Sequence, residues 1–209
     1  MTLSSCLRLG LVAACLMLGA CAAALQFATA EPPRLYELTP KSTFVDDLPA
    51  VAGRLSVEVP TATAGLNSAR IALRPTPTTL EYYAGASWID VVPVMVQNLV
   101  LESLDNTGKV DVLGREVVGV RADLALLTHI REFQAEYDTA GAPLVRVRLQ
   151  ARLIRLPRRT SLAATSEEFV VRAKDNSLPA IIDAFDEAFG KALKRIVEWA
   201  VQQSAAAAA

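Results

Sequence analysis

A cysteine preceded by small residues at the end of an apolar run is the best candidate for covalent chemistry in this chain. The run begins at Leu9, directly after the positive charge of Arg8, and closes with the Leu-Gly-Ala-Cys segment Leu18–Cys21. This order is typical of a bacterial lipobox, in which a leader is cleaved and acyl chains such as palmitate are attached to the cysteine. The pattern predicts a signal peptide over residues 1–20 and lipidation of Cys21.

Two other outcomes for the N-terminal segment stay open. Residues 28–30 (Ala-Thr-Ala) form an A-x-A site, where cleavage would release a soluble domain. Left uncut, the uncharged stretch 9–30 is long enough to span a bilayer, for which about 20 apolar residues suffice. Cys15 is a second candidate for the lipid, but the apolar stretch before it is short. The lipobox is favoured because Cys21 stands where the apolar region of an export signal should end.

The residues after Cys21 indicate the membrane in which the lipid anchor is expected. Ala22 is not the Asp that favours retention in the inner membrane, so we expect a periplasm-facing lipid anchor in the inner leaflet of the outer membrane. Residues 21–33 are mostly small or polar and include two prolines, which predicts a flexible tether. Two or more acyl chains would attach it stably, because each buried methylene contributes about 0.8 kcal/mol.

The rest of the chain offers little for catalysis. The motifs G-x-x-x-x-G-K-[ST], H-E-x-x-H, C-x-x-C and G-x-S-x-G are absent from the sequence, and His129 is the single histidine. The cysteines are Cys6, Cys15 and Cys21, so the mature domain has no thiol pair for a disulfide or a metal site. We therefore expect no enzyme activity, no cofactor and no metal. A hydrolase that depends on His129 is the least favoured alternative.

Three arginines form the first candidate surface for a partner. Arg146, Arg148 and Arg152 alternate with apolar residues, so they share one face of a predicted strand. Such a face could bind anionic lipid headgroups or an acidic partner. It could equally be an ordinary wet sheet face, with the arginines paired to Glu132 or Glu136 across a hairpin.

Three aromatic residues form the second candidate surface. Tyr82, Tyr83 and Trp88 lie within seven residues of one another in a chain with only 6% aromatic residues. Aromatic side chains of this kind are common anchors at protein interfaces. They are also common in cores where a strand meets a helix. Both interpretations stay open.

Composition limits the class of protein. The chain has 209 residues, 21 Lys and Arg against 22 Asp and Glu, and a net charge of −1, which is not the basic balance of a nucleic-acid-binding protein. Its length suits one domain, and 52% hydrophobic residues are enough for a sizeable core.

The hydrophobic pattern predicts a single α+β domain over residues 34–203. Its mixed, mostly antiparallel sheet would be covered on one face by two helices. The predicted strands cover residues 54–59, 69–74, 79–84, 110–113, 120–133, 144–156 and 168–173, with a polar turn over 158–166.

The two helices have recognisable start and stop signals. The first would be capped by Ser87, with Pro93 early in the helix, and would end at residues 106–108 (Asn-Thr-Gly). The second would open at Ser177 with Pro179 in its first turn. The Ala-rich residues 204–209 would form a frayed, disordered tail.

Several segments together resemble a known family, the ABC-type transport auxiliary lipoproteins of the PqiC-like group. The long hairpin and the C-terminal helix also follow in a similar order, so the resemblance covers nearly all of the mature chain. Its most specific part is the aromatic motif of Tyr82, Tyr83 and Trp88. Beside the lipobox, the segments that carry it are Leu35–Pro40 (LYELTP), Leu66–Ile71 (LNSARI) and Leu80–Trp88 (LEYYAGASW).

The resemblance implies a role in transport. Members accompany an ABC permease, its ATPase and a mammalian-cell-entry (MCE) domain protein, which together move lipids or other hydrophobic molecules between the inner and outer membranes. The lipoprotein is the non-catalytic component on the outer-membrane side, attached through the residue that matches Cys21. Whether the protein forms a homo-oligomer stays open. The alternative from a different class is a periplasmic module that carries a lipid in an apolar cavity.

Overall fold

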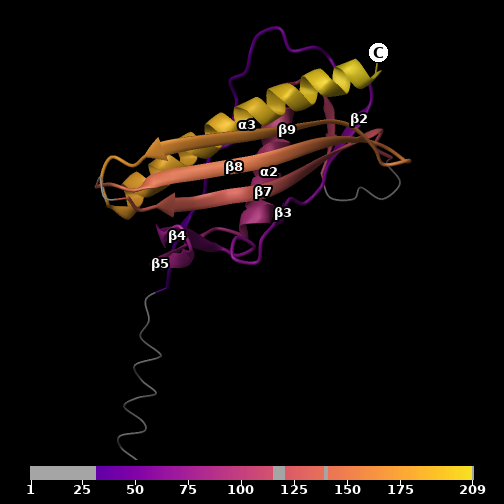
Figure 1. Ribbon diagram of the computed structural model, residues 1–209. Helices are drawn as coiled ribbons and strands as arrows, with labels where there is room; N and C mark the ends of the chain where they lie inside the picture. The colour runs from indigo at the N-terminus through magenta and orange to yellow at the C-terminus, as the bar shows by residue number, and fades with distance from the viewer. Residues whose placement is uncertain (1–31, 115–120, 139–140, 209) are drawn as a thin grey trace, which may run out of the picture. The chain divides into compact units, whose positions relative to one another are not determined.

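In the computed structural model, three long strands form a continuous antiparallel meander at the centre of the fold. They are β7 (Leu124–Glu136), β8 (Leu144–Arg155) and β9 (Thr160–Arg172) (Figure 1). In β8, the buried residues Val145, Val147 and Leu149 alternate with more exposed polar ones. This alternation gives the meander one apolar face and one polar face.

Three short strands follow one another along the other edge of β7. They are β2 (Arg54–Val57), β3 (Thr61–Ala62) and β4 (Arg70–Thr76), and each runs parallel to β7. Because β7 is thirteen residues long, one strand can pair with all three in succession. Residues 54–76 are thereby brought beside β7 along its whole length.

The remaining strands extend this mixed sheet of nine strands. β5 (Thr79–Trp88) pairs antiparallel with β4, β1 (Arg34–Tyr36) pairs parallel with β5, and β6 (Asp111–Leu113) pairs parallel with β2. In the described part of the chain, β9 pairs only with β8.

Two helices pack on the apolar face of the sheet. α2 (Val92–Asp105) packs against β2, β6 and α3, and α3 (Leu178–Ala208) packs along β8 and β9 (Figure 1). The core between the layers contains a cluster of four buried aromatic residues: Trp88, Phe133, Phe185 and Phe189. The domain is therefore α+β, with two helices on one face of a mixed sheet, as the sequence predicts.

The start of the first helix differs from its prediction. Ser87 lies within β5 and does not cap a helix. α2 is instead preceded by Val91, which makes no side-chain capping bond, while Pro93 stands in the first turn as expected. Ser87 pairs with Leu35 of β1 and Arg70 of β4, so contacts with distant strands override the local capping signal.

Two further predictions near the C-terminus are wrong. Residues 160–166 are not a polar turn but the first half of β9, which pairs with β8 along its length. The chain does not fray at Ser204, because α3 continues to Ala208 and Ser204 is fully buried. The helix persists because it is packed, and alanine is the best helix former.

The structure describes residues 32–114, 121–138 and 141–208, and its compact unit begins at Arg34. The predicted signal peptide, Cys21 and its competitors, and most of the tether lie outside these residues. No helix in the described ranges has the length and apolar character needed to cross a bilayer.

Candidate functional site

The tryptophan of the aromatic motif belongs to the core. The Trp88 side chain is 1% exposed, and its ring packs edge-on against Phe133 and Phe185 at centroid distances of 5.7 and 5.2 Å. A side chain this buried cannot meet a partner directly. Of the two interpretations of Trp88, the structure therefore selects the core, and its proposed place in a partner-binding surface is wrong.

The two tyrosines are half-buried and join neighbouring segments. The Tyr82 hydroxyl donates to the carbonyl of Gly65 at 2.9 Å, and the Arg70 guanidinium stacks over its ring at 3.6 Å. The Tyr83 hydroxyl lies 3.0 Å from that of Tyr137, at the end of β7. Burial and this hydrogen bond raise the pKa of Tyr83, so it stays neutral. Partner binding by the tyrosines stays a prediction.

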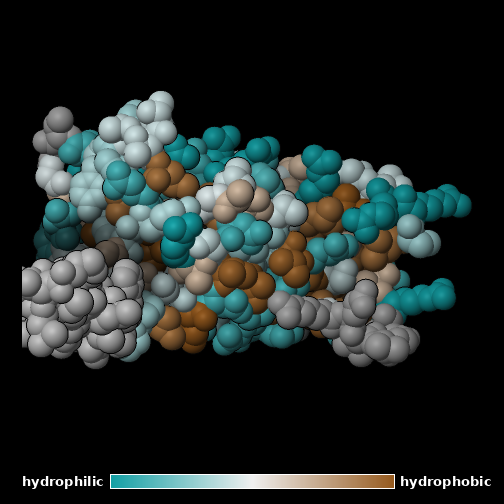
Figure 2. Space-filling model, turned by 90° about the horizontal axis from the view of Figure 1, so that it is seen from below, coloured by the Kyte–Doolittle hydropathy of each residue, from teal (hydrophilic) through white to brown (hydrophobic). Residues whose placement is uncertain are grey.

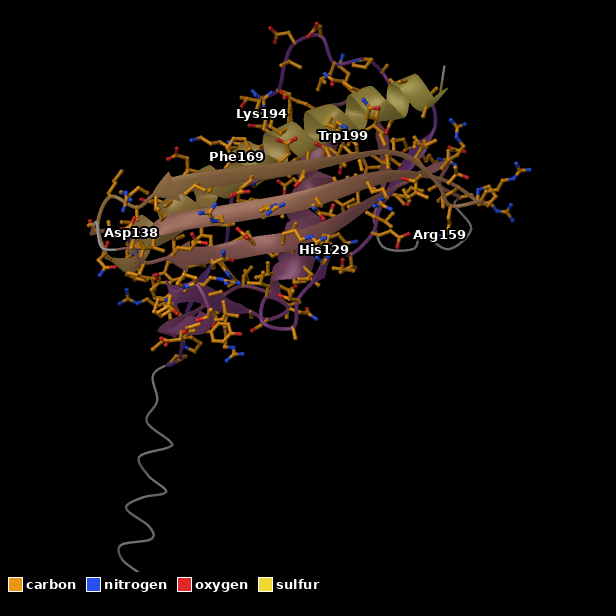
Figure 3. The ribbon with its side chains drawn as sticks, viewed as in Figure 1. His129, Asp138, Arg159, Phe169, Lys194 and Trp199 are labelled. Carbon is orange, nitrogen blue, oxygen red and sulfur yellow. The ribbon has the colours of Figure 1, made fainter. Side chains whose placement is uncertain are left out.

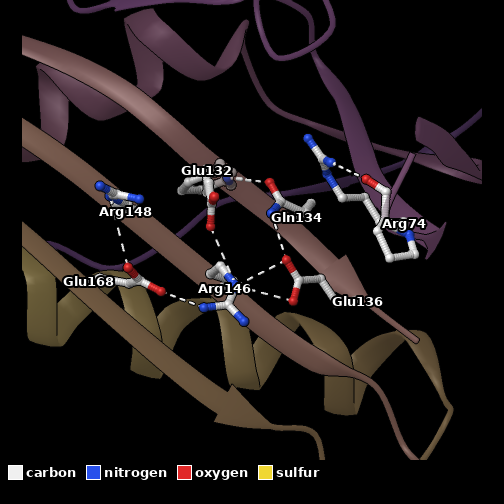
Figure 4. Close-up of polar contacts among 9 residues, drawn as sticks. Arg74, Glu132, Gln134, Glu136, Arg146, Arg148 and Glu168 are labelled. Atoms are coloured by element: carbon white, nitrogen blue, oxygen red, sulfur yellow. Dashed lines mark hydrogen bonds and ion pairs between the residues drawn. The ribbon is translucent and has the colours of Figure 1, made fainter. Parts of the chain in front are cut away.

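The polar face of the meander carries an ion-paired cluster around Arg146 (Figure 4). The Arg146 Nε lies 3.0 Å from Glu136 Oε1 and 3.4 Å from Glu132 Oε2, and its Nη1 bonds Glu168. The Arg148 Nε lies 3.8 Å from the other oxygen of Glu168. We call these two arginines and three glutamates the paired cluster. They come from β7, β8 and β9, as the cross-strand alternative proposed.

The arginines and glutamates of the paired cluster offset one another's charge. The hydrogen bond with Glu136 is the largest influence that raises the pKa of Arg146, and the bond with Glu168 adds to it. Burial alone would raise the pKa of Glu136, but hydrogen bonds from Arg146 and Gln134 outweigh it and lower the pKa. Arg146 and Arg148 are therefore already neutralised by carboxylates, and this end of the face is a poor site for an anionic partner.

Arg152 lies in a different environment. It is exposed, and no residue in the described part of the chain forms an ion pair with it. It lines a groove of about 620 Å³ that crosses β7, β8 and β9 on the polar face. We call this the basic groove; its polar lining includes Thr61, His129, Arg131, Gln150, Arg152 and Ser166.

The basic groove was only partly visible in the sequence. The sequence alone does not single out Arg131 or Thr61, and for His129 it favours a structural or surface role over catalysis. In the structure His129 lies on the helix-free face of β7 (Figure 3) and its Nδ1 is 2.7 Å from the Thr61 hydroxyl. The alternation of Leu127, His129 and Arg131 along β7 was the available signal.

The geometry offers little support for bond-making chemistry. The other ring nitrogen of His129 meets no carboxylate in the part of the chain described, so the Thr61–His129 pair lacks the orienting group of a nucleophilic triad. Burial, with the nearby Arg131 charge, lowers the pKa of His129. Within residues 32–114, 121–138 and 141–208, no three His, Cys, Asp or Glu side chains are placed to hold a metal.

Exposed apolar side chains are scattered over the described surface. Figure 2, which views the molecule from below, shows hydrophobic residues as several patches separated by hydrophilic ones. The large exposed apolar residues are spread along the described chain: Leu35, Val45, Val59, Ile89, Leu162 and Val170. Val59 is among them because β2 ends at Val57, short of the predicted strand. Single exposed apolar residues are normal for a soluble domain and mark no particular site.

Comparisons with known proteins agree with this architecture. A protein from Bradyrhizobium diazoefficiens, "Uncharacterized protein bll6063", is 29% identical over 155 residues. The match covers 72% of this chain but 40% of that protein, so the chain spans less than half the length of this relative.

Two solved structures share the fold. Protein XCC0632 of Xanthomonas campestris, from the DUF330 family, aligns with a TM-score of 0.76 and 25% identity, over 81% of this chain and 95% of its own. The hypothetical protein CT253 of Chlamydia trachomatis aligns with a TM-score of 0.52 and 8% identity, over 74% and 98%. At 8% identity, the second likeness concerns the fold alone.

The family itself is identified by a match that covers most of the chain. The model of the ABC-type transport auxiliary lipoprotein component matches residues 36–197, from β1 to deep within α3. The match includes the aromatic motif, the meander and both helices. The chain therefore belongs to the ABC-type transport auxiliary lipoprotein family.

Proposed function

We propose that this protein is a non-catalytic lipoprotein of the outer membrane that assists an ABC transport system with an MCE-domain partner. It would help move lipids or other hydrophobic molecules between the two membranes. The observation that carries the proposal is the family match over residues 36–197. In support, the compact domain begins at Arg34, which leaves residues 21–33 to link it to a lipid on Cys21.

The proposed action is tethering, in which no bond is made or broken. Acyl chains on Cys21 would hold one end of the chain in the bilayer, and two or more of them give stable attachment. The folded domain would bind the transport complex on the periplasmic side. The closely packed aromatic core between the sheet and the helices suits this role, because a well-packed interior holds the surface of the domain in one shape.

The test is co-purification from membranes with the neighbouring permease, ATPase and MCE protein expressed together. We expect the wild-type protein to fractionate with the outer membrane and to retain the MCE protein after detergent extraction. Cys21→Ser should release it from the membrane, while Cys15→Ser, a matched change inside the leader, should not. Membrane attachment that survives Cys21→Ser, or an MCE protein that never co-purifies, would contradict the proposal.

A lipid carrier remains the alternative from a different class, but no observation favours it. A carrier needs an enclosed apolar cavity of about 300 Å³ or more. The basic groove is large enough, but it is an open hollow in which two arginines stand beside apolar residues, and it is not an enclosed apolar cavity. Native mass spectrometry of the purified protein separates the two ideas, because a carrier would retain an intact lipid.

A further inference from the structure

The basic groove is built from two rows of side chains that cross the meander. In one row Leu127 of β7 lies opposite Arg152 of β8, which lies opposite Ala164 of β9. In the next row His129, Gln150 and Ser166 are paired in the same way. The small side chains on β9 leave room above the sheet, so the hollow follows from the sequence of that strand.

A β-bulge adds a second cation to the groove. Ile130 pairs with Leu149 and Glu132 pairs with Arg148, so Arg131 is an extra residue on β7. Bulges turn a side chain away from its regular direction and are common beside functional sites. The Arg131 Nε donates to Gln150 Oε1 at 2.7 Å, which places the guanidinium beside the second row and outside the paired cluster.

The charges of the groove are unbalanced. The guanidinium groups of Arg131 and Arg152 line it beside the His129 ring, and no described Asp or Glu does. The paired cluster, one row further along the same face, has three glutamates for its two arginines. Among the described residues, Arg131 is hydrogen-bonded by the neutral Gln150 and by no carboxylate, so both guanidinium groups of the groove keep donors for a ligand.

The neutral side chains of the groove are donors of the kind that bind anions. The Ser166 hydroxyl is exposed on β9, and the Thr61 hydroxyl lies against the His129 ring. Because Gln150 accepts through Oε1, its amide N–H groups remain to donate. Guanidinium pairs with hydroxyl and amide donors match the oxygens of a phosphate group better than those of any neutral ligand.

We propose that the basic groove binds a phosphate group, held by the guanidinium groups of Arg131 and Arg152. Two sources share this chemistry: the phosphodiester of an anionic lipid headgroup, and free phosphate. The inference rests on the charges and register of the polar face and does not depend on the proposed transport role.

The single histidine is a natural reporter for this site. Its pKa is lowered by burial and by Arg131, and it faces Thr61 of β3 and Gln150 of β8. An anion bound between the arginines would offset that charge and raise the pKa. The imidazole signals of His129 are therefore followed by NMR across pH, using the full mature protein with inorganic phosphate or with dihexanoylphosphatidylglycerol below its micelle concentration.

We expect saturable binding and an upward shift in the pKa of His129 with at least one of the two probes. A response to the lipid alone assigns the site to headgroups, and a response to both assigns it to phosphate in general. Arg152→Gln should weaken binding about tenfold, the loss expected for one charge-assisted contact. Thermal unfolding of the exposed Arg152 variant should be unchanged, which separates lost binding from lost structure.

Arg148→Gln is the matched control, because it removes the same charge from the same face of the same strand. Arg148 is already paired with Glu168, so its loss should change the affinity less than twofold. The proposal is overturned if neither probe shifts His129, or if both variants weaken binding equally, which would indicate only non-specific attraction to a charged surface.

Discussion

Both ends of the polar sheet face carry arginines of β8, but the two ends differ in electrostatic character. Arg146 and Arg152 lie on one face of one strand, six residues apart. Arg146 is enclosed by glutamates of β7 and β9, whereas Arg152 lies beside small and neutral residues. The comparison shows that the neighbours across the sheet decide whether an arginine stabilises the fold or remains available to a ligand.

The largest expected effect is a loss of stability on changing the aromatic core, which packs beneath the polar sheet face. Phe185→Ala removes a ring packed against Trp88 and Phe133, and should lower the free energy of unfolding by about 3–5 kcal/mol. Urea denaturation of the purified domain measures it. Phe169→Ala, at a half-exposed site on β9, should cost clearly less. Equal losses would mean that the core is not centred on the aromatic cluster.

The second prediction contrasts the two arginines directly. Arg146→Met leaves three glutamates, two of them partly buried, without their shared cation and should lower the free energy of unfolding by about 1–2 kcal/mol. Arg152→Gln should change it by less than about 0.5 kcal/mol, as for an unpaired surface residue. The same denaturation assay applies to both. If Arg152→Gln is the more destabilising, the two environments have been assigned the wrong way round.

The smallest effect concerns acid stability of the paired cluster. The pKa of Glu136 is lowered by folding, so its stabilising contribution is complete above its ordinary value of 4.5 and is lost as the pH falls through the lowered folded value. Glu136→Gln should therefore flatten the acid side of a plot of melting temperature against pH. Glu81→Gln, at an exposed site with no ion pair in the described chain, should leave the slope unchanged.

Regular alternation made some of these features predictable. The pattern from Leu144 onward predicts β8 to within one residue of its observed end at Arg155, and places Arg146, Arg148 and Arg152 on one face. Ser177 likewise marks the start of α3, since its hydroxyl accepts from the backbone N–H of Ala180. The alternation of β8 and the Ser177 cap each depend on residues that are close in the sequence, so both can be predicted from it.

Features that depend on pairing between distant strands were not predictable in this way. Only the second half of β9 is predicted, because its first half is small and polar and becomes a strand by pairing with β8. The separation of Arg152 from Arg146 depends on register, which places Ala164 opposite one and Val170 opposite the other. The bulge after Ile130 has no sequence signature, and it shifts the register so that Glu132, and not Arg131, pairs with Arg148.

The central claim is that a lipid on Cys21 holds this domain at the membrane, and the most direct measurement is the intact mass of protein extracted from membranes. If Cys21 is lipidated, we expect a polypeptide that begins at Cys21 and carries the added mass of acyl chains, including palmitate. A chain that begins at Glu31 with no acyl group would contradict it.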